Sequence, residues 1–197
     1  MSSKPTIVGV TGGIGSGKST ICKIFEVLGC KTYYADDRAK WIMEHNAEVI
    51  NAVKVLFGNE AYQEAKLNRK WIAERAFKDD SLLGRLNDIV HPAVKSDFIK
   101  WVSQNQDSKV LCKEAALLFE NGSYKELDTC ILVVSDVETR VDRVLARDKH
   151  RDEEGVRDII RKQMSDEEKM PLADFVIGNN GDESVIKQAI EIYSKLS

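Results

Sequence analysis

The chain has 197 residues, of which 43% are hydrophobic and 31% charged, so it can form one packed domain. Its formal net charge of −3 gives no overall attraction for nucleic acid or for an anionic membrane surface. No segment approaches the roughly 20 apolar residues of a membrane span, and the short polar start at residues 1–5 does not resemble a signal peptide. We therefore expect a cytoplasmic protein without nucleic-acid or membrane partners.

The cysteines are predicted to be free thiols. Cys22, Cys30, Cys112 and Cys130 form no CxxC pair, and Cys22 and Cys112 lie inside apolar stretches. We expect reduced side chains in a reducing compartment rather than a disulfide or a metal site.

The N-terminal region predicts a strand, a glycine-rich loop and a helix. Residues 7–10 form a short β-branched run that is typical of a buried strand. A helix is expected from Lys18 to Leu28, because apolar residues repeat with helical spacing along one face: Ile21, Ile24, Phe25 and Leu28. Gly29 is suited to end this helix.

A long helical insertion is predicted after the second strand. That strand is expected over residues 31–35, with Asp36 at its end. From residue 37 to about residue 106 the apolar positions repeat with helical spacing, and residues 105–108 form a polar turn.

Strands and helices alternate in the rest of the chain. Three further strands are predicted, over residues 110–116, 130–134 and 175–177. Ser135 and Glu138 form a capping-box pattern that would open a charged helical stretch. Ser184 is expected to cap the final helix. The alternation predicts an α/β fold in which helices cover both faces of a parallel sheet.

The decisive motif is a phosphate-binding loop (P-loop) of the form GxxxxGK[ST], which residues 12–19 match without a mismatch. Its glycines let the backbone wrap round phosphate oxygens, and the helix that follows adds positive potential. We expect Lys18 to reach the β- and γ-phosphates of a nucleoside triphosphate and Ser19 to bind Mg²⁺. The expected nucleotide-binding residues are Gly13, Ile14, Gly15, Ser16, Gly17, Lys18, Ser19 and Thr20.

Among P-loop proteins, the sequence favours a small-molecule kinase. It has no NKxD-type motif for guanine, and the DxxG match at residues 152–155 lies in a charged helical stretch rather than at a strand end. Motor and AAA-type ATPases usually need a larger domain. Two rivals stay open: a nucleoside or nucleoside monophosphate kinase, and a non-catalytic nucleotide-binding module.

Asp36 is the candidate base for an acceptor hydroxyl. It follows the second strand, and ligands of such folds gather at the carboxyl edge of the sheet. Asp is also a favoured helix N-cap, and the spacing alone does not decide between these two roles.

Four arginines predict a cationic helix face. Arg140, Arg143, Arg147 and Arg151 are spaced by three or four residues and could clamp transferring phosphates. The alternative is a solvated face on which they pair with Asp142, Asp148 and Asp152. With a P-loop upstream, we favour a lid.

Taken together, these residues resemble the dephospho-coenzyme A kinase family over nearly the whole chain. The likeness begins with the P-loop segment at residues 10–20 and continues with Ala35 and Asp36. The further matching positions are residues 67–69, 74–77, 91–92, 117–120, 143, 147–148, 163, 173–174 and 179–181. Their shared order and spacing carry the resemblance.

The resemblance implies transfer of the γ-phosphate of ATP to the 3′-hydroxyl of the ribose of dephospho-coenzyme A, with Mg²⁺. It implies a single P-loop kinase domain. Its parts would be a nucleotide-binding core (about 1–36, 109–134 and 170–197), a helical acceptor-binding region (about 37–108) and a charged helical lid (about 135–169). The oligomeric state does not follow from the sequence, and we favour a monomer.

The resemblance also implies roles for single residues. Asp36, Lys18 and Arg143 would be catalytic, and Arg147 would be a lid residue near ATP. Asn179 and Gly181 would hold the adenine. The acceptor would be bound by Asp36, Arg69 and His91, although a His before a Pro is more often a turn residue.

Two positions depart from the family pattern. Tyr34 stands where the family often has the first Asp of Asp-Ala-Asp, so only Asp36 survives of that pair. Ala116 replaces a common Pro. Glu114 lies near the position of a carboxylate that could support Mg²⁺ through water.

Overall fold

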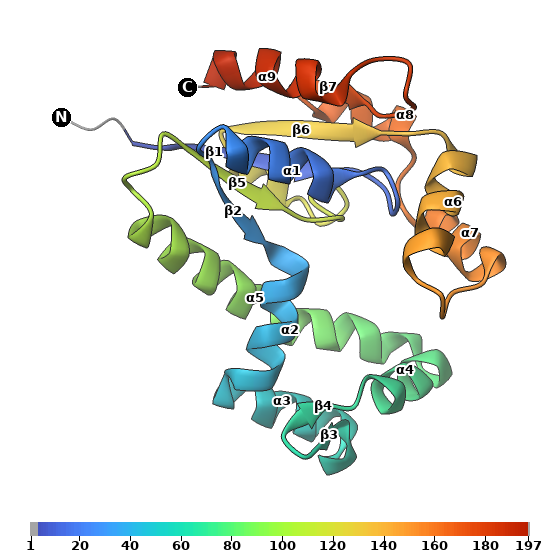
Figure 1. Ribbon diagram of the computed structural model, residues 1–197. Coiled ribbons are helices and arrows are strands. Elements are labelled where there is room, and N and C mark those ends of the chain that lie inside the picture. The colour runs from blue at the N-terminus through green and yellow to red at the C-terminus, as the bar shows by residue number, and fades with distance from the viewer. Residues whose placement is uncertain (1–3, 197) are drawn as a thin grey trace. The chain divides into compact units, whose positions relative to one another are not determined.

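The structure is a computed structural model that describes residues 4–196, apart from the side chains of residues 77, 78 and 80. The chain divides into two compact units. The first unit comprises residues 4–34 and 105–196, and the second comprises residues 35–104. Figure 1 shows the elements of both, coloured from the N-terminus to the C-terminus.

The first unit is built on a five-stranded sheet in the order β2-β5-β1-β6-β7 (Figure 1). Its strands are β1 (Thr6–Thr11), β2 (Lys31–Tyr34), β5 (Val110–Glu114), β6 (Thr129–Val134) and β7 (Phe175–Gly178). Each neighbouring pair is parallel. The predicted α/β fold with a parallel sheet is thus confirmed, although β2 and β5 end slightly earlier than the sequence suggested.

Two helices pack together against one face of this sheet. They are α1 (Lys18–Val27) and α9 (Val185–Leu196), and their inward side chains join those of the strands in one apolar core. Ile21 and Phe25, which the periodicity placed on the inner face of α1, are buried there. The Ser184 hydroxyl accepts a hydrogen bond from the Lys187 amide at 3.4 Å, so the predicted cap of α9 is confirmed.

A second apolar cluster packs on the other face of β6. Cys130 and Leu132 alternate along the strand with residues of the first core, so they point the opposite way. They pack with Phe119 from the segment after β5 and with Met164. Within that segment lies the short helix η2 (Ser123–Glu126).

Three helices follow β6: α6 (Val137–Arg147), α7 (Glu153–Lys162) and α8 (Asp166–Lys169), with η3 (Met170–Leu172) after them. Val141 and Val144 of α6 form a small core with Val156 of α7, and Ile14 of the P-loop packs against it. The P-loop therefore has an apolar contact with this segment.

The predicted capping box at Ser135 and Glu138 is wrong. The N-cap of α6 is Asp136, and its side chain makes no capping hydrogen bond. The Ser135 hydroxyl instead lies 2.9 Å from Asn180 Oδ1, and Glu138 pairs with Arg157. A capping box is formed further along, at the start of α8, where the sequence pattern is the same.

The second unit is mainly helical, as the periodicity of residues 37–106 predicted. Its helices are α2 (Ala35–His45), α3 (Ala47–Phe57), α4 (Arg69–Lys78) and α5 (Asp80–Gln104), with the short helix η1 (Asn59–Ala61). A hairpin of β3 (Tyr62–Gln63) and β4 (Lys66–Leu67) was not predicted. Its turn uses positive φ at Glu64 and Ala65, two residue types that do not signal such a turn.

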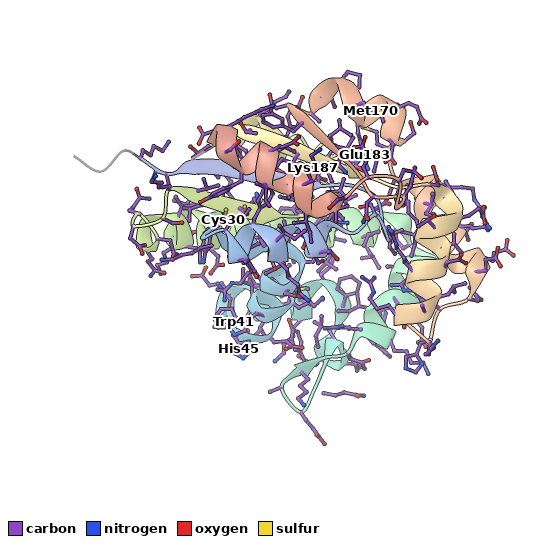
Figure 2. All side chains as sticks on the ribbon, turned by 45° about the horizontal axis from the view of Figure 1, so that its top comes forward. Cys30, Trp41, His45, Met170, Glu183 and Lys187 are labelled. Atoms are coloured by element: carbon purple, nitrogen blue, oxygen red, sulfur yellow. The ribbon has the colours of Figure 1, made fainter. Side chains whose placement is uncertain are left out.

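Apolar side chains from α2, α3, η1, α4 and α5 form the core of the second unit, with Val53 and Phe57 among the most buried. On α2, the rings of Trp41 and His45 stack with centroids 4.6 Å apart (Figure 2). The Arg38 guanidinium lies over the same Trp41 ring and pairs with Asp97 of α5. The second unit therefore has its own core and its own ion pair.

Candidate active site

The P-loop turn, residues 12–17, joins the end of β1 to the start of α1. Three of its glycines adopt backbone angles that other residues rarely reach, with φ of 147° at Gly12, 78° at Gly15 and 102° at Gly17. The amides of Gly15 and Gly17 make no hydrogen bond within the described part of the chain. Open amides beside the N-terminus of a helix suit an anion such as phosphate.

Lys18 is folded back onto the loop. Its Nζ donates hydrogen bonds to the carbonyl oxygens of Gly12 at 3.0 Å and Gly13 at 3.2 Å, and the side chain is buried. Ser19 and Thr20 are exposed in the first turn of α1. The cation and the hydroxyls that the motif predicted thus lie on the same short stretch of chain.

The arginines of the predicted lid do not form one cationic face. Arg140 is buried, donates from Nε to the Ile14 carbonyl at 2.9 Å, and lies 3.8 Å from the Asp166 carboxylate. Arg151 lies beyond the end of α6 and pairs with Asp148 at 2.9 Å. The expectation of four clamping cations is therefore wrong for these two, because burial and local pairing occupy them.

Arg147 is exposed, and its side chain makes no hydrogen bond or ion pair among residues 4–196. Arg143 is half-buried and bound to the loop after β7. Its Nη2 donates to the Asn179 carbonyl at 2.8 Å, and its Nη1 donates to the Ser135 hydroxyl at 3.2 Å. The two predicted lid arginines therefore differ in how freely they can move.

Asn179 connects the end of β7 to the P-loop. Its Nδ2 donates to the Ser16 carbonyl at 2.8 Å, and its backbone amide donates to the Val134 carbonyl at 2.9 Å. A Cβ atom on Gly17 would collide with the Asn179 side chain, so this close approach requires glycine. Gly181, two residues on, has a φ of 97° with open space round it. The first unit thus brings the P-loop, Arg143 and Asn179 together.

The remaining site candidates belong to the second unit, on three different helices. Asp36 lies inside the first turn of α2, so it is not an N-cap residue that precedes the helix. Arg69 is the first residue of α4. His91 lies in the interior of α5, immediately before Pro92, so its interpretation as a turn residue is wrong. All three side chains are exposed and make no hydrogen bond or ion pair within the described residues.

Comparison with known proteins decides the family. A family model for dephospho-CoA kinase matches residues 6–184. The chain belongs to the dephospho-CoA kinase family. It is similar to the dephospho-CoA kinase of Salinibacter ruber (strain DSM 13855 / M31), with 41% identity over 179 residues that cover 89% of each protein.

Solved structures agree with this membership of the dephospho-CoA kinase family. TT1252 from Thermus thermophilus is 32% identical, with a TM-score of 0.87 over 99% of this chain and 100% of that one. A dephospho-CoA kinase from Campylobacter jejuni is 26% identical, with a TM-score of 0.70 over 97% of this chain and 96% of that one.

Membership decides between the readings of the P-loop that the sequence left open. The dephospho-CoA kinase family consists of ATP-dependent kinases of coenzyme A biosynthesis, so a nucleotide-binding transferase is established for this chain. A nucleoside or nucleoside monophosphate kinase is not favoured, and neither is a non-catalytic binding module.

Two side-chain contacts in this member of the dephospho-CoA kinase family were not predicted from the sequence. Gln163 accepts a hydrogen bond from the Ile14 amide at 2.9 Å. The fully buried Lys169 lies 2.9 Å from a carboxylate oxygen of Glu120, outside good hydrogen-bond geometry. In a charged helical segment, buried and exposed charges look alike in sequence. The uncharged amide of Gln163, in a segment of mostly charged residues, was the sequence signal that could have pointed to its contact with the P-loop.

The described His, Cys, Asp and Glu side chains form no group of three or more that could hold a metal ion. Within residues 4–196, each helix is too short or too polar to cross a membrane.

Proposed function

We propose that the protein transfers the γ-phosphate of ATP to the 3′-hydroxyl of the ribose of dephospho-CoA. The observation that carries the proposal is a complete P-loop, with open amides at Gly15 and Gly17, in a member of the dephospho-CoA kinase family. We further propose that the first unit binds ATP, that α6–α8 act as a lid, and that the second unit binds the acceptor.

In this proposal the P-loop residues hold the triphosphate. The open amides and the N-terminus of α1 bind phosphate oxygens. Lys18 exchanges its bonds to the Gly12 and Gly13 carbonyls for contacts with the β- and γ-phosphates, because a phosphate is the stronger acceptor. Its charge then stabilises the phosphoryl group during transfer.

The residues present fit Mg²⁺. Ser19 is exposed at the start of α1, and Glu114 is buried at the end of β5, the strand next to the one that leads into the P-loop. Mg²⁺ commonly takes few protein ligands and completes its shell with waters and substrate phosphates. When bound there, Mg²⁺ would neutralise charge on the phosphates.

Asp36 orients the acceptor hydroxyl and takes its proton late in the transfer. Its carboxylate in the first turn of α2 is exposed and has no partner among the described residues, so it is able to accept a hydrogen bond from a substrate. Arg69 and His91 contact other parts of the acceptor in this proposal, as cation and hydrogen-bond donor. Their exposure leaves both side chains available.

Arg147 is the lid cation that we expect to reach the phosphates, since its side chain is exposed and unpaired within the described residues. Arg143 can act on them only by exchanging its present bonds to Ser135 and Asn179. Asn179 and Gly181 would form the edge of the adenine site. Closure of the lid would exclude water, which would otherwise hydrolyse ATP.

We also propose that the protein works as a monomer in the cytoplasm. Cys22, Cys30, Cys112 and Cys130 are free and buried, as expected for a protein of a reducing compartment. A buried thiol is a small apolar side chain and needs no partner.

The test is product formation by the purified protein with Mg-ATP and dephospho-CoA, followed by mass. Coenzyme A should form only with ATP present. The Asp36→Asn variant should lower kcat by about 10²-fold or more, as expected for loss of a general base.

Asp37→Asn is the matched control. Asp37 lies in the same first turn of α2, so both variants lose the same favourable interaction with the helix dipole. Unlike Asp36, Asp37 pairs with Lys40 at 2.7 Å. Equal activity in the two variants would refute the role of Asp36. If ATP bound but no coenzyme A formed, a panel of nucleosides and nucleoside monophosphates would test for another acceptor.

A further inference from the structure

Two side chains from the segment after β6 hold both backbone polar groups of a single P-loop residue. Gln163 Oε1 accepts from the Ile14 amide at 2.9 Å, and Arg140 Nε donates to the Ile14 carbonyl at 2.9 Å. Arg140 Nη2 also lies 3.5 Å from Gln163 Oε1, so the two side chains are in contact. We call this set of contacts the Ile14 clamp.

Arg140 packs closely against the loop on both sides of Ile14. A Cβ atom on Gly13 would overlap the Arg140 guanidinium, and one on Gly15 would overlap the Arg140 carbonyl. Arg140 is 5% exposed, and the carboxylate of Asp166 lies 3.8 Å from it. A shift of the Arg140 side chain away from the loop would break its partly buried hydrogen bond to Ile14.

Ile14 lies between the two peptide groups that matter for phosphate binding. A peptide unit is planar, with its N–H and C=O pointing in opposite directions. A partner on the Ile14 N–H therefore fixes the direction of the Gly13 carbonyl, which accepts from Lys18 Nζ. A partner on the Ile14 carbonyl fixes the direction of the Gly15 N–H, one of the open amides.

We propose that Gln163 is a positioning residue for the triphosphate, which acts with Arg140 through the two peptide planes that flank Ile14. Gln163 sets the carbonyl that holds Lys18, and Arg140 aims the Gly15 amide at the phosphate. The proposal rests on the binding of ATP phosphates by the P-loop, as proposed above. The segment that carries Arg140 and Gln163 would then support phosphate binding through the P-loop backbone, without touching the phosphate itself.

The decisive variant is Gln163→Met, which keeps the length of the side chain and removes its acceptor. The probes are ATP, inorganic tripolyphosphate and adenosine, with affinities measured by titration calorimetry on the full-length protein. Loss of the clamp should weaken ATP and tripolyphosphate by the same factor, about tenfold or about 1.4 kcal/mol. Adenosine should bind as it does to the unchanged protein, since it has no phosphate.

Arg157→Gln is the matched control in the same segment. It breaks the pair between Arg157 of α7 and Glu138 of α6 but touches no P-loop group. Its affinities should stay at those of the unchanged protein. A loss of affinity for all three probes with Gln163→Met would overturn the proposal, because it would indicate general damage to the site. Unchanged affinities would overturn it too.

A double-mutant cycle provides a second test. Because Gln163 and Arg140 act on the same residue, the losses in Gln163→Met and Arg140→Gln should not add in the double variant. Additive losses would refute the shared action. Thermal melts of each variant identify any that fail to fold. If the unchanged protein did not bind tripolyphosphate, the proposed role of the P-loop would fail instead, which keeps the two outcomes distinct.

Discussion

The surroundings of the P-loop and the acceptor-side residues of the second unit are built in opposite ways. Lys18, Arg143 and Asn179 are wholly or partly buried and hydrogen-bonded to backbone groups of the first unit. Asp36 and Arg69 are exposed and have no side-chain partner among the described residues, and the same is true of His91. In the surroundings of the P-loop, which we call the first region, the residues that would bind substrate also stabilise the fold. The acceptor-side residues of the second unit are the second region.

The difference indicates where the protein can be changed without cost to stability. A P-loop must keep its amides in fixed positions before ATP arrives, so its neighbours pack closely. An acceptor site that receives a long, flexible substrate can leave its side chains in water until binding. Substitutions should therefore affect stability and activity together in the first region, and activity alone in the second.

The largest effect is expected from Lys18→Ala. Removal of this cation should lower kcat/KM by about 10³-fold, because its charge stabilises the phosphates in the transition state. The control is Lys23→Ala on the same helix, since Lys23 is exposed and away from the loop. Steady-state kinetics with varied ATP would decide, and equal values for the two variants would contradict the role of Lys18.

A smaller effect is expected in the second region from Arg69→Ala. The KM for dephospho-CoA should rise about tenfold with little change in the KM for ATP, as for the loss of one charge-assisted contact. The Tm should not change, because the Arg69 side chain is exposed and unpaired in the described part of the chain.

Lys70→Ala is the control for Arg69, because Lys70 is the next cation along and is also exposed. A fall in Tm for Arg69→Ala alone would show that the second region is braced in the same way as the first. That result would break the comparison between the two regions.

The sequence predicted most of the fold because its signals are local. Short β-branched strands, a glycine motif and helical periodicity gave the sheet and α1 to within a few residues. The failure of the predicted cap at Ser135 could not be foreseen, because the Ser135 hydroxyl interacts with Asn180, 45 positions along the chain. The β3–β4 hairpin was missed because Glu64 and Ala65 do not signal a turn with positive φ.

The site was predicted residue by residue, but its internal contacts were not. Helical spacing showed that Arg140 and Arg143 lie near each other, and it could not show that one is buried under the P-loop. The contact between Gln163 and Ile14 joins residues 149 positions apart. Contacts of this kind depend on the packed tertiary structure, which hydrophobic periodicity does not encode.

The smallest effect concerns alkaline pH and tests the packing of the first unit, which holds all four cysteines. Burial raises the pKa of the Cys130 thiol from 9.0 to about 11, so the folded state keeps its proton in a range where the unfolded state loses it. The contribution of the Cys130 thiol to the free energy of unfolding is fully present below pH 9 and is lost as the pH rises toward 11. The free energy of unfolding should therefore fall by about 1 kcal/mol between pH 9 and pH 10 through Cys130 alone.

Cys130→Ala isolates this contribution, because other groups titrate in the same range. Urea unfolding of both proteins across this pH range should give a shallower slope for the variant, even though the variant is less stable at neutral pH through its lost packing. Identical slopes would mean that water reaches Cys130 in the folded state. The core of the first unit would then be less tightly packed than its close contacts indicate. The proposed difference in packing between the two units would become smaller.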